Sequence, residues 1–371
     1  MHTIKCYFFC MTMMLFSISA ASAEETVKIG AIFALTGEAA VDNESSLAGV
    51  RNGVQEINKQ GGILGKKVQL LVFDNFSTPI RSSIAAEKAA DAGVSAIVGP
   101  AWSSHAIPIA KIAQERKIPM ITNSATNPKI SKIGNYIFRA CYIDDFQGEV
   151  MAQFARNDLQ AATAIVFIDL TSDFSMGLAG IFKKHFEQLG GKVLLELKYK
   201  YKQKSFNNLI EKAKHTDADV LFMSGHDESG QIVKEAQNAG IKSTPIGSDG
   251  WDSQSFFEKG GDELKRGYHC ASWSEASDSE ISRRFVKKYE NEFHLTGGGV
   301  LGYDAVLLLA DAITRAGSAD RGKIRDAIAD TRSFKGVTGD ITFDENGDPV
   351  KSAVIMTIEN GKPRYLKTME P

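Results

Sequence analysis

The chain has few cysteines and only one long apolar run, and both shortages limit what it can be. Of four cysteines in 371 residues, Cys6 and Cys10 lie in the apolar N-terminal stretch, which leaves Cys141 and Cys270. An exported protein permits a disulfide between these two, but two cysteines without a spacing motif leave that bridge open. After residue 23 there is no run of about 18 apolar residues, so we expect no membrane-spanning segment there.

Basic stripes and metal-binding spacings are also missing. The formal net charge is −2 at pH 7 without a cluster of lysine and arginine, so nucleic acid is not an expected partner. The seven histidines are scattered, and we predict no metal site and no cofactor. His226 follows a predicted strand beside Asp227 and Glu228, a position more typical of a solvated cap than of a ligand contact.

Two short patterns suggest catalysis or cofactor binding, but their contexts favour other interpretations. Gly297–Gly302 matches G-x-G-x-x-G, yet it follows a predicted helix, so we expect a glycine-rich turn before a helix over 301–316. Ser103 and His105 suggest a nucleophile with its base. Because residues two apart at a helix start diverge and no third orienting group is evident, we predict a ligand-binding hydroxyl and no enzyme.

Residues 1–23 have the pattern of an export signal. A lysine precedes an apolar run from Cys6 to Ile18, and Ala21-Ser22-Ala23 forms a small-x-small cleavage site before two glutamates. This segment is too short for a membrane anchor, so we predict a cleaved signal peptide and a product released into the periplasm.

The rest of the chain alternates short apolar strands with helices, which is typical of parallel sheets wrapped by helices. One set of strands is expected at 27–35, 68–73, 96–98 and 120–122, with helices at 45–59, 79–92 and 103–116 between them. A second set begins at 164–168, and after it the tail gives helices and two strands. Length alone favours two lobes, because about 350 residues exceed one usual core.

The stretch from Ile97 to Thr126 carries the clearest binding signal. Ser103-Ser104 follows one predicted strand, and Asn123-Ser124-Ala125-Thr126 follows the next. Both turns lie at carboxyl ends of parallel strands, where open α/β sheets bind ligands. Ser103 and Ser104 are also placed to cap the next helix, whose N-terminus favours an anion. We therefore predict an anion site here, suited to a phosphate or a carboxylate.

Several segments, in this order and spacing, resemble one family over the whole chain after the leader. They are KIGAIFALTG (28–37), GGILGKKVQLLVFD (61–74), VGPAWSS (98–104), PMITNSAT (119–126), GQIVKEAQNAG (230–240), GSDGWDS (247–253) and ITFDENGD (341–348). The chain is similar to the branched-chain amino-acid binding proteins of bacterial ABC importers, which are type I periplasmic binding proteins. The resemblance implies two Rossmann-like α/β lobes joined by three hinge crossings. It places 24–142 with 274–350 in one lobe and 143–273 with 351–371 in the other.

The resemblance also implies a ligand site between the lobes. Ser103, Ser124 and Thr126 match residues that hold the ligand's α-carboxylate and ammonium, with Ala125 between the last two, and Asp249 matches the acidic partner of the ammonium. Phe174 stands where many members carry a tyrosine, and Gly225 where another aromatic residue is common, so Gly225 leaves room for a bulkier ligand side chain. Trp102 and Ser77 match the two positions of a disulfide found in some relatives, so Trp102 is free to fill or cap the pocket.

The function implied is that of a monomeric periplasmic receptor. It would close on a free amino acid, branched-chain or otherwise apolar, and deliver it to the permease subunits of an ABC importer. A ligand-sensing module for an amino acid or small amide is the alternative. Arg139, before the first crossing, and Asp144-Asp145, after it, could either fix the hinge or pair across the cleft.

Overall fold

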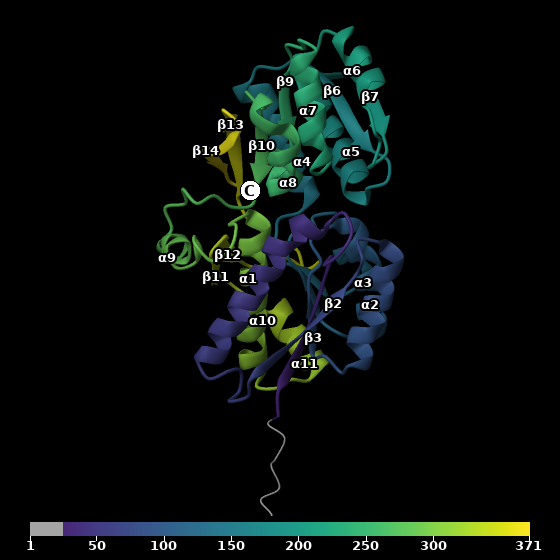
Figure 1. Cartoon of the computed structure of the whole chain (residues 1–371). Helices are drawn as coiled ribbons and strands as arrows, with labels where there is room; N and C mark the ends of the chain where they lie inside the picture. The colour runs from purple at the N-terminus through teal and green to yellow at the C-terminus, as the bar shows by residue number, and fades with distance from the viewer. Residues whose placement is uncertain (1–24) are drawn as a thin grey trace, which may run out of the picture.

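The computed structural model describes residues 25–371, so the predicted signal peptide and its cleavage site lie outside the described residues. The described chain forms two α/β lobes, one above the other in Figure 1. We call the lobe that contains β1 the N-lobe and the other the C-lobe.

The N-lobe is built on a five-stranded parallel sheet in the order β2-β1-β3-β4-β5. Its strands are β1 (Val27–Phe33), β2 (Val68–Asp74), β3 (Ala96–Val98), β4 (Met120–Thr122) and β5 (Ile137–Arg139). Alternate residues of β1 point to opposite faces, as the two-residue period of a strand requires. One set packs against α1 (Ala40–Lys59), α10 (Gly297–Ala316) and α11 (Arg321–Ala329), while the other face is covered by α2 (Pro79–Asp91) and α3 (Ser103–Glu115).

The C-lobe sheet has seven strands in the order β14-β13-β10-β9-β8-β6-β7. They are β6 (Thr163–Asp169), β7 (Lys192–Tyr199), β8 (Val220–Met223), β9 (Thr244–Gly247), β10 (Tyr268–Ala271), β13 (Ala353–Glu359) and β14 (Lys362–Met369). The parallel part, β7-β6-β8-β9-β10, repeats the strand order of the N-lobe, and the last two strands add an antiparallel edge.

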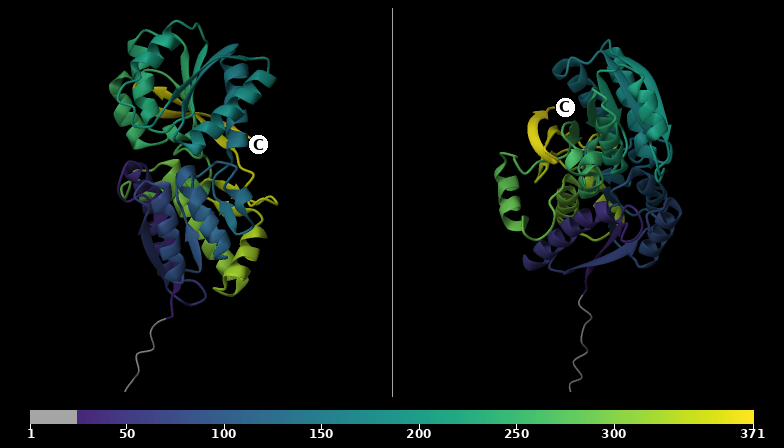
Figure 2. Two further views of the ribbon diagram at one scale, coloured as in Figure 1. Left: turned by 90° about the vertical axis from the view of Figure 1, so that its right-hand side faces the viewer. Right: turned by 45° about the horizontal axis from the view of Figure 1, so that its top comes forward.

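Helices cover both faces of the C-lobe sheet as well. They are α4 (Asp144–Gln153) with a π-helical turn (Phe154–Asp158), α5 (Asp173–Gln188), α6 (Asn207–Lys214), α7 (Glu228–Asn238) and α8 (Gln254–Gly260). After β10 the chain returns to the N-lobe, and this segment contains a separate helix, α9 (Glu280–Tyr289). It also contains a small hairpin of β11 (Phe334–Gly336) and β12 (Gly339–Ile341). Figure 2 shows the yellow C-terminal strands in the upper lobe, so the chain passes between the lobes three times, after β5, after β10 and after β12.

The predicted two-lobe α/β class is confirmed, and the boundaries of several elements need correction. α1 begins at Ala40 and not at residue 45, and α5 begins at Asp173. β11 and α8 had no sequence prediction. Cys141 and Cys270 are both free and buried, which settles the open disulfide: the Cys270 thiol lies 3.2 Å from the Tyr142 hydroxyl instead.

The glycine-rich segment at 297 is the first turn of α10, so the predicted turn there is wrong. α10 is long and apolar enough to cross a membrane by composition, yet 78% of its apolar window is buried in the fold. Glycines let it approach α1 closely: a methyl group on Gly49 would lie 1.9 Å from the carbonyl oxygen of Gly299. One on Gly302 would lie 2.3 Å from the carbonyl oxygen of Ser46. Close packing of two backbones explains these glycines, of which sequence reasoning had assigned those at 297–302 to a turn.

We expect Gly49→Ala to destabilise the protein by about 3 kcal/mol, because backbone atoms cannot yield to the added methyl group without separating the helices. Gly180→Ala in α5 is the matched control, since nothing lies within 4 Å of that methyl position. Replacing a helical glycine in open space should stabilise by about 0.5–1 kcal/mol. Urea denaturation of both variants measures the difference, and equal stabilities would show that the α1–α10 contact tolerates separation.

Candidate functional site

A cavity of about 380 Å³ lies between the lobes, at the carboxyl ends of the parallel strands. Its N-lobe wall comes from the loop between β3 and α3, the turn after β4, and the first turns of α1 and α10. Its C-lobe wall comes from the start of α5 and the segments after β8 and β9. This is the position that the strand pattern predicted.

The N-lobe wall carries the predicted hydroxyls. Ser103, Ser124 and Thr126 all line the cavity, and Ser103 and Thr126 are almost fully buried. The prediction that Ser103 and Ser104 cap α3 is wrong: Trp102 is the N-cap residue and makes no side-chain capping bond. Ser103 Oγ accepts a hydrogen bond from the amide of Asn127 at 3.2 Å instead, which leaves its hydroxyl hydrogen for a ligand.

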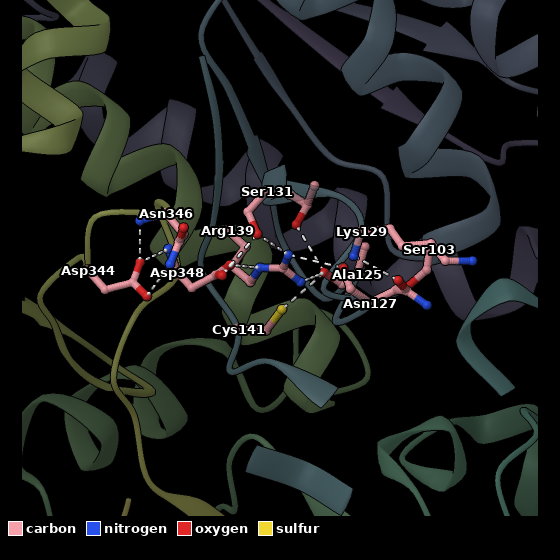
Figure 3. A network of polar contacts seen from close by, with 11 residues as sticks. Ser103, Ala125, Asn127, Lys129, Ser131, Arg139, Cys141, Asp344, Asn346 and Asp348 are labelled. Atoms are coloured by element: carbon pink, nitrogen blue, oxygen red, sulfur yellow. Dashed lines mark hydrogen bonds and ion pairs between the residues drawn. The ribbon is translucent and has the colours of Figure 1, made fainter. Parts of the chain in front are cut away.

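The turn after β4 is held by a buried arginine, shown in Figure 3. Arg139 is fully buried and pairs with Asp348 at 2.5 Å. Its other nitrogens donate to the carbonyl oxygens of Ala125 (2.8 Å) and Asn127 (3.1 Å) and to the Ser131 hydroxyl (3.0 Å). Among residues 25–371 Arg139 forms no ion pair across the cleft, and its charged partner Asp348 lies just before the third crossing. Of the two roles left open for Arg139, the contacts therefore support the first, which is to fix the hinge.

Ala125 lies behind the cavity wall. It is fully buried and does not line the cavity, and its carbonyl oxygen is taken by Arg139 and approached by the Cys141 thiol. Its contribution is therefore to position Ser124 and Thr126.

The C-lobe wall supplies the predicted acid. Asp249 lines the cavity, and within residues 25–371 it forms no ion pair with a lysine or arginine. Burial raises its pKa well above the usual range, and the nearby Asp144 carboxylate raises it further. Gln147 links the two acids, accepting from the Asp249 amide at 2.7 Å and donating to Asp144 at 3.2 Å. A cation in the cavity would favour the ionised form of Asp249, which burial otherwise disfavours.

An aromatic stack closes one side of the cavity. The rings of Trp102 and His226 lie 4.2 Å apart and nearly parallel, although they belong to different lobes. Phe174 lies on the other side of His226 at 4.8 Å, and the Tyr201 ring meets Trp102 edge-on at 5.8 Å. The prediction of a solvated His226 is wrong, because the residue is 8% exposed and lines the cavity.

Gly225 does not leave room for a ligand, contrary to the prediction. A methyl group there would lie 2.2 Å from both the Glu228 carboxylate and the Tyr199 hydroxyl, so protein atoms already fill the space. Its carbonyl oxygen accepts a hydrogen bond from Ser248. The aromatic surface that resemblance placed at this position is supplied by its neighbour, His226.

Sequence reasoning missed the part of the site that is formed by helix starts. Asp42, Ser45 and Ser46 from α1, and Gly297 and Gly298 from α10, line the cavity. Asp42 lies in the first turn of α1, the helix that follows β1. Its place after the carboxyl end of a predicted strand was the sequence signal that could have identified it. The α10 residues carried no local signal, because only packing against α1 brings them there.

Direct bonds already join the lobes around the cavity. The Asp173 amide donates to the Ser104 hydroxyl (3.0 Å), and Asn127 donates to the Asp173 carbonyl oxygen (2.7 Å). On the other side the Gly297 amide donates to Asp252 at 2.8 Å. The described residues contain no cluster of three or more histidine, cysteine or acidic side chains able to hold a metal. The cavity is thus bridged by direct bonds on two sides, with hydroxyls on one wall and a carboxylate on the other.

Comparison with known proteins gives the family. The family model described as periplasmic binding protein matches residues 26–363. The chain belongs to the periplasmic binding protein family. It is 30% identical over 338 residues to Leu/Ile/Val-binding protein homolog 1 of Brucella abortus (strain 2308), covering 90% of this chain and 91% of that protein.

Two solved structures of this periplasmic binding protein family share the fold closely. A leucine binding protein from Thermotoga maritima superposes with a TM-score of 0.89 at 32% identity, covering 93% of this chain and 99% of that one. A branched-chain amino acid transporter substrate binding protein from Streptococcus pneumoniae, in complex with isoleucine, also gives 0.89, at 29% identity, with 94% and 100% covered. The type I periplasmic binding fold and the predicted resemblance are confirmed.

A buried acid behind the site should make stability depend on pH. Glu228 accepts from the Tyr199 hydroxyl (2.6 Å) and the His226 amide (3.2 Å), while its other oxygen is buried without a partner. Burial raises the pKa of Glu228 to about 8. The folded state therefore holds a proton that the unfolded state has lost, and stability falls as pH rises toward 8.

We expect the free energy of unfolding to fall between pH 6.5 and 8.5 and the fall to be shallower in Glu228→Gln. One proton held only by the folded state lowers stability by up to about 1.4 kcal/mol per pH unit. Burial also raises the pKa values of Asp42 and Asp144 to about 7, so these acids add to the pH dependence of stability in both proteins. The difference in slope between wild type and the variant therefore measures the contribution of Glu228. Glu211→Gln, at an exposed site, is the control. Equal slopes for wild type and Glu228→Gln, measured by urea denaturation, would contradict the assignment.

Proposed function

We propose that this protein is the substrate-binding component of an ABC importer, which encloses a free amino acid between its lobes in the periplasm and delivers it to a membrane permease. The observation that carries the proposal is the opposition of two kinds of group across one closed cavity. Hydroxyls of Ser103, Ser124 and Thr126 lie on the N-lobe side, and Asp249 lies on the C-lobe side.

The two walls are complementary to an amino-acid zwitterion. Hydroxyl groups and the N-terminal end of α3 favour a carboxylate, because free amides and the helix dipole are directed toward it. An acid without a basic partner suits an ammonium group, and a charge-assisted pair removed from water is strong. A phosphate would satisfy only the first wall and would be repelled by Asp249. These groups provide no nucleophile with an orienting base, so we propose binding without turnover.

Enclosure requires that the lobes open and close. We propose lobe boundaries at 24–142 with 274–350 and at 143–273 with 351–371. The hydrophobic clusters of the two sheets support this division, because each cluster lies within one lobe except for Tyr142, which is at the boundary and packs with the C-lobe. The Lys351 ammonium, in the third crossing, donates to the Ala140 carbonyl oxygen in the first at 3.2 Å, which ties two hinge strands together. A ligand that contacts both walls favours the closed arrangement by its differential affinity.

A thermal-shift screen of the purified protein tests this function. The compounds are amino acids, small amides, inorganic phosphate and carboxylates without an amine. We expect amino acids to raise the melting temperature, since a ligand at 100 times its Kd adds about 2.7 kcal/mol of stability. Stabilisation by amine-free carboxylates but by no amino acid would overturn the role of Asp249, and stabilisation by phosphate alone would overturn the ligand class.

A further inference from the structure

The cavity beyond the zwitterion-binding walls is polar. Many pockets for apolar ligands are lined mainly by hydrophobic side chains, whereas most residues that line this one are polar or charged. Serines at 45, 46, 253 and 272 and Thr296 contribute hydroxyls. The lining is also acidic, since it includes two glutamates and three aspartates but only one arginine, Arg51. Some of these hydroxyls already have protein partners, as between Ser45 and Thr296. An aliphatic side chain would offer no hydrogen bond to the lining groups that still lack one.

Two groups in this lining have unused hydrogen-bonding capacity. His226 is 8% exposed, and within residues 25–371 its ring nitrogens form no hydrogen bond with protein atoms. Asp42 has a carboxylate oxygen, Oδ1, that is buried without a partner. Both groups line the cavity and can bond a ligand. Leaving a buried polar atom such as Asp42 Oδ1 unpaired costs about 1–3 kcal/mol, and a ligand donor would remove that cost.

The position of His226 is fixed by its neighbours. Its ring is held between Trp102 at 4.2 Å and Phe174 at 4.8 Å, and both of these residues also line the cavity. Burial lowers the pKa of His226 to about 4, so the ring is neutral at pH 7 and has one donor and one acceptor nitrogen. The backbone of His226 lies beside the turn that carries Asp249: a methyl group on Gly250 would lie 3.2 Å from the His226 Cα.

Building on the amino-acid function proposed above, we propose that His226 contacts the bound ligand and sets its specificity, so that the site selects an amino acid whose side chain donates hydrogen bonds over an aliphatic one of the same shape. The acidic lining acts in the same direction, because carboxylates accept hydrogen bonds and repel an acidic side chain. This differs from the apolar ligand expected from the resemblance. The selected ligands are amino acids whose side chains carry an amide, a hydroxyl or an amine.

Isothermal titration calorimetry with shape-matched ligands tests the proposal. Asparagine is compared with leucine and threonine with valine, with glycine as the reference that has no side chain. We expect asparagine and threonine each to bind at least tenfold more tightly than their partners, because an aliphatic group leaves polar groups of the site unpaired. Leucine binding as tightly as asparagine, and valine as tightly as threonine, would overturn the proposal.

The variant His226→Phe keeps a ring in the stack and removes both nitrogens. We expect the asparagine-to-leucine preference to fall to less than about threefold while leucine affinity is retained, as expected for the loss of about one hydrogen bond. His226→Gln, which keeps a donor and an acceptor but removes the stacked ring, should retain part of the preference. His215→Phe is the control, since that histidine is exposed on the surface, and should leave all affinities unchanged. An unchanged preference in His226→Phe would also overturn the proposal.

These results separate the two proposals. If no amino acid binds, glycine included, the proposed function fails and the specificity proposal fails with it. If amino acids bind and the aliphatic ones bind more tightly, the proposed function stands and only the role of His226 is overturned. The wild-type ratios give this answer even if a variant does not fold.

Discussion

Asp249→Asn is expected to weaken amino-acid binding at least about 30-fold while leaving the unliganded protein folded. The substitution keeps the shape of the side chain and removes the charge that pairs with the ligand's ammonium group. Loss of one partner from a desolvated charge pair costs about 2–5 kcal/mol, because the other charge stays buried without compensation. At about 1.4 kcal/mol for each factor of ten, affinity should fall by roughly 30-fold to several thousand-fold.

The unliganded variant should be as stable as wild type or more stable. Burial raises the pKa of Asp249, which means that its ionised form is disfavoured in the closed cavity, and an amide carries no such cost. Calorimetric titration and thermal melting at pH 7.5 measure the two effects. Asp278→Asn, at an exposed position, is the control and should change neither quantity. Retained affinity in Asp249→Asn would show that the ammonium has another partner.

Arg139→Ala should destabilise the protein by about 3–5 kcal/mol. Arg139 is fully buried, and its removal takes the positive charge away from Asp348. It also takes one donor each from the Ser131 hydroxyl and from two carbonyl oxygens of the 125–127 turn (Figure 3). An unpaired buried charge accounts for most of this cost. Because the same turn presents Ser124 and Thr126 to the cavity, amino-acid affinity should fall as well.

Urea denaturation followed by circular dichroism measures the loss of stability. Arg364→Ala is the control, since Arg364 forms an exposed ion pair with Glu359 at 3.2 Å and should cost no more than about 1 kcal/mol. The double variant Arg139→Met/Asp348→Leu removes both charges and should recover part of the loss, because no buried charge is left unpaired. A loss in Arg139→Ala no larger than in the surface control would show that the buried pair does not hold the turn.

Much of the site could be predicted from sequence where function depends on local order. Ser103, Ser124 and Thr126 follow strands that the apolar pattern identifies, and parallel strands bring their carboxyl ends to one edge. The resemblance added Asp249, which follows β9. All four line the cavity. Their assignment to a ligand remains a prediction that the experiments above test.

The errors share one physical cause, which is competition from distant groups. Ser104 did not cap its own helix because the Asp173 amide, 69 residues further on, takes its hydroxyl. Local capping and such a long-range bond are nearly equal in energy, so only the fold decides between them. His226 was expected in solvent, but Trp102 from the other lobe covers it.

The sequence by itself determined the two α/β lobes, the order of strands and helices along the chain, and the edge of the sheets where the cavity lies. These follow from hydrophobic periodicity and from glycine and proline positions, which are properties of a short window of chain. The tertiary structure alone decided which turns meet across the cleft, that Arg139 anchors the 125–127 turn, and that glycines at 297–302 begin a helix. Those outcomes depend on close packing and on the burial of charge between segments far apart in the chain, and no local pattern encodes them.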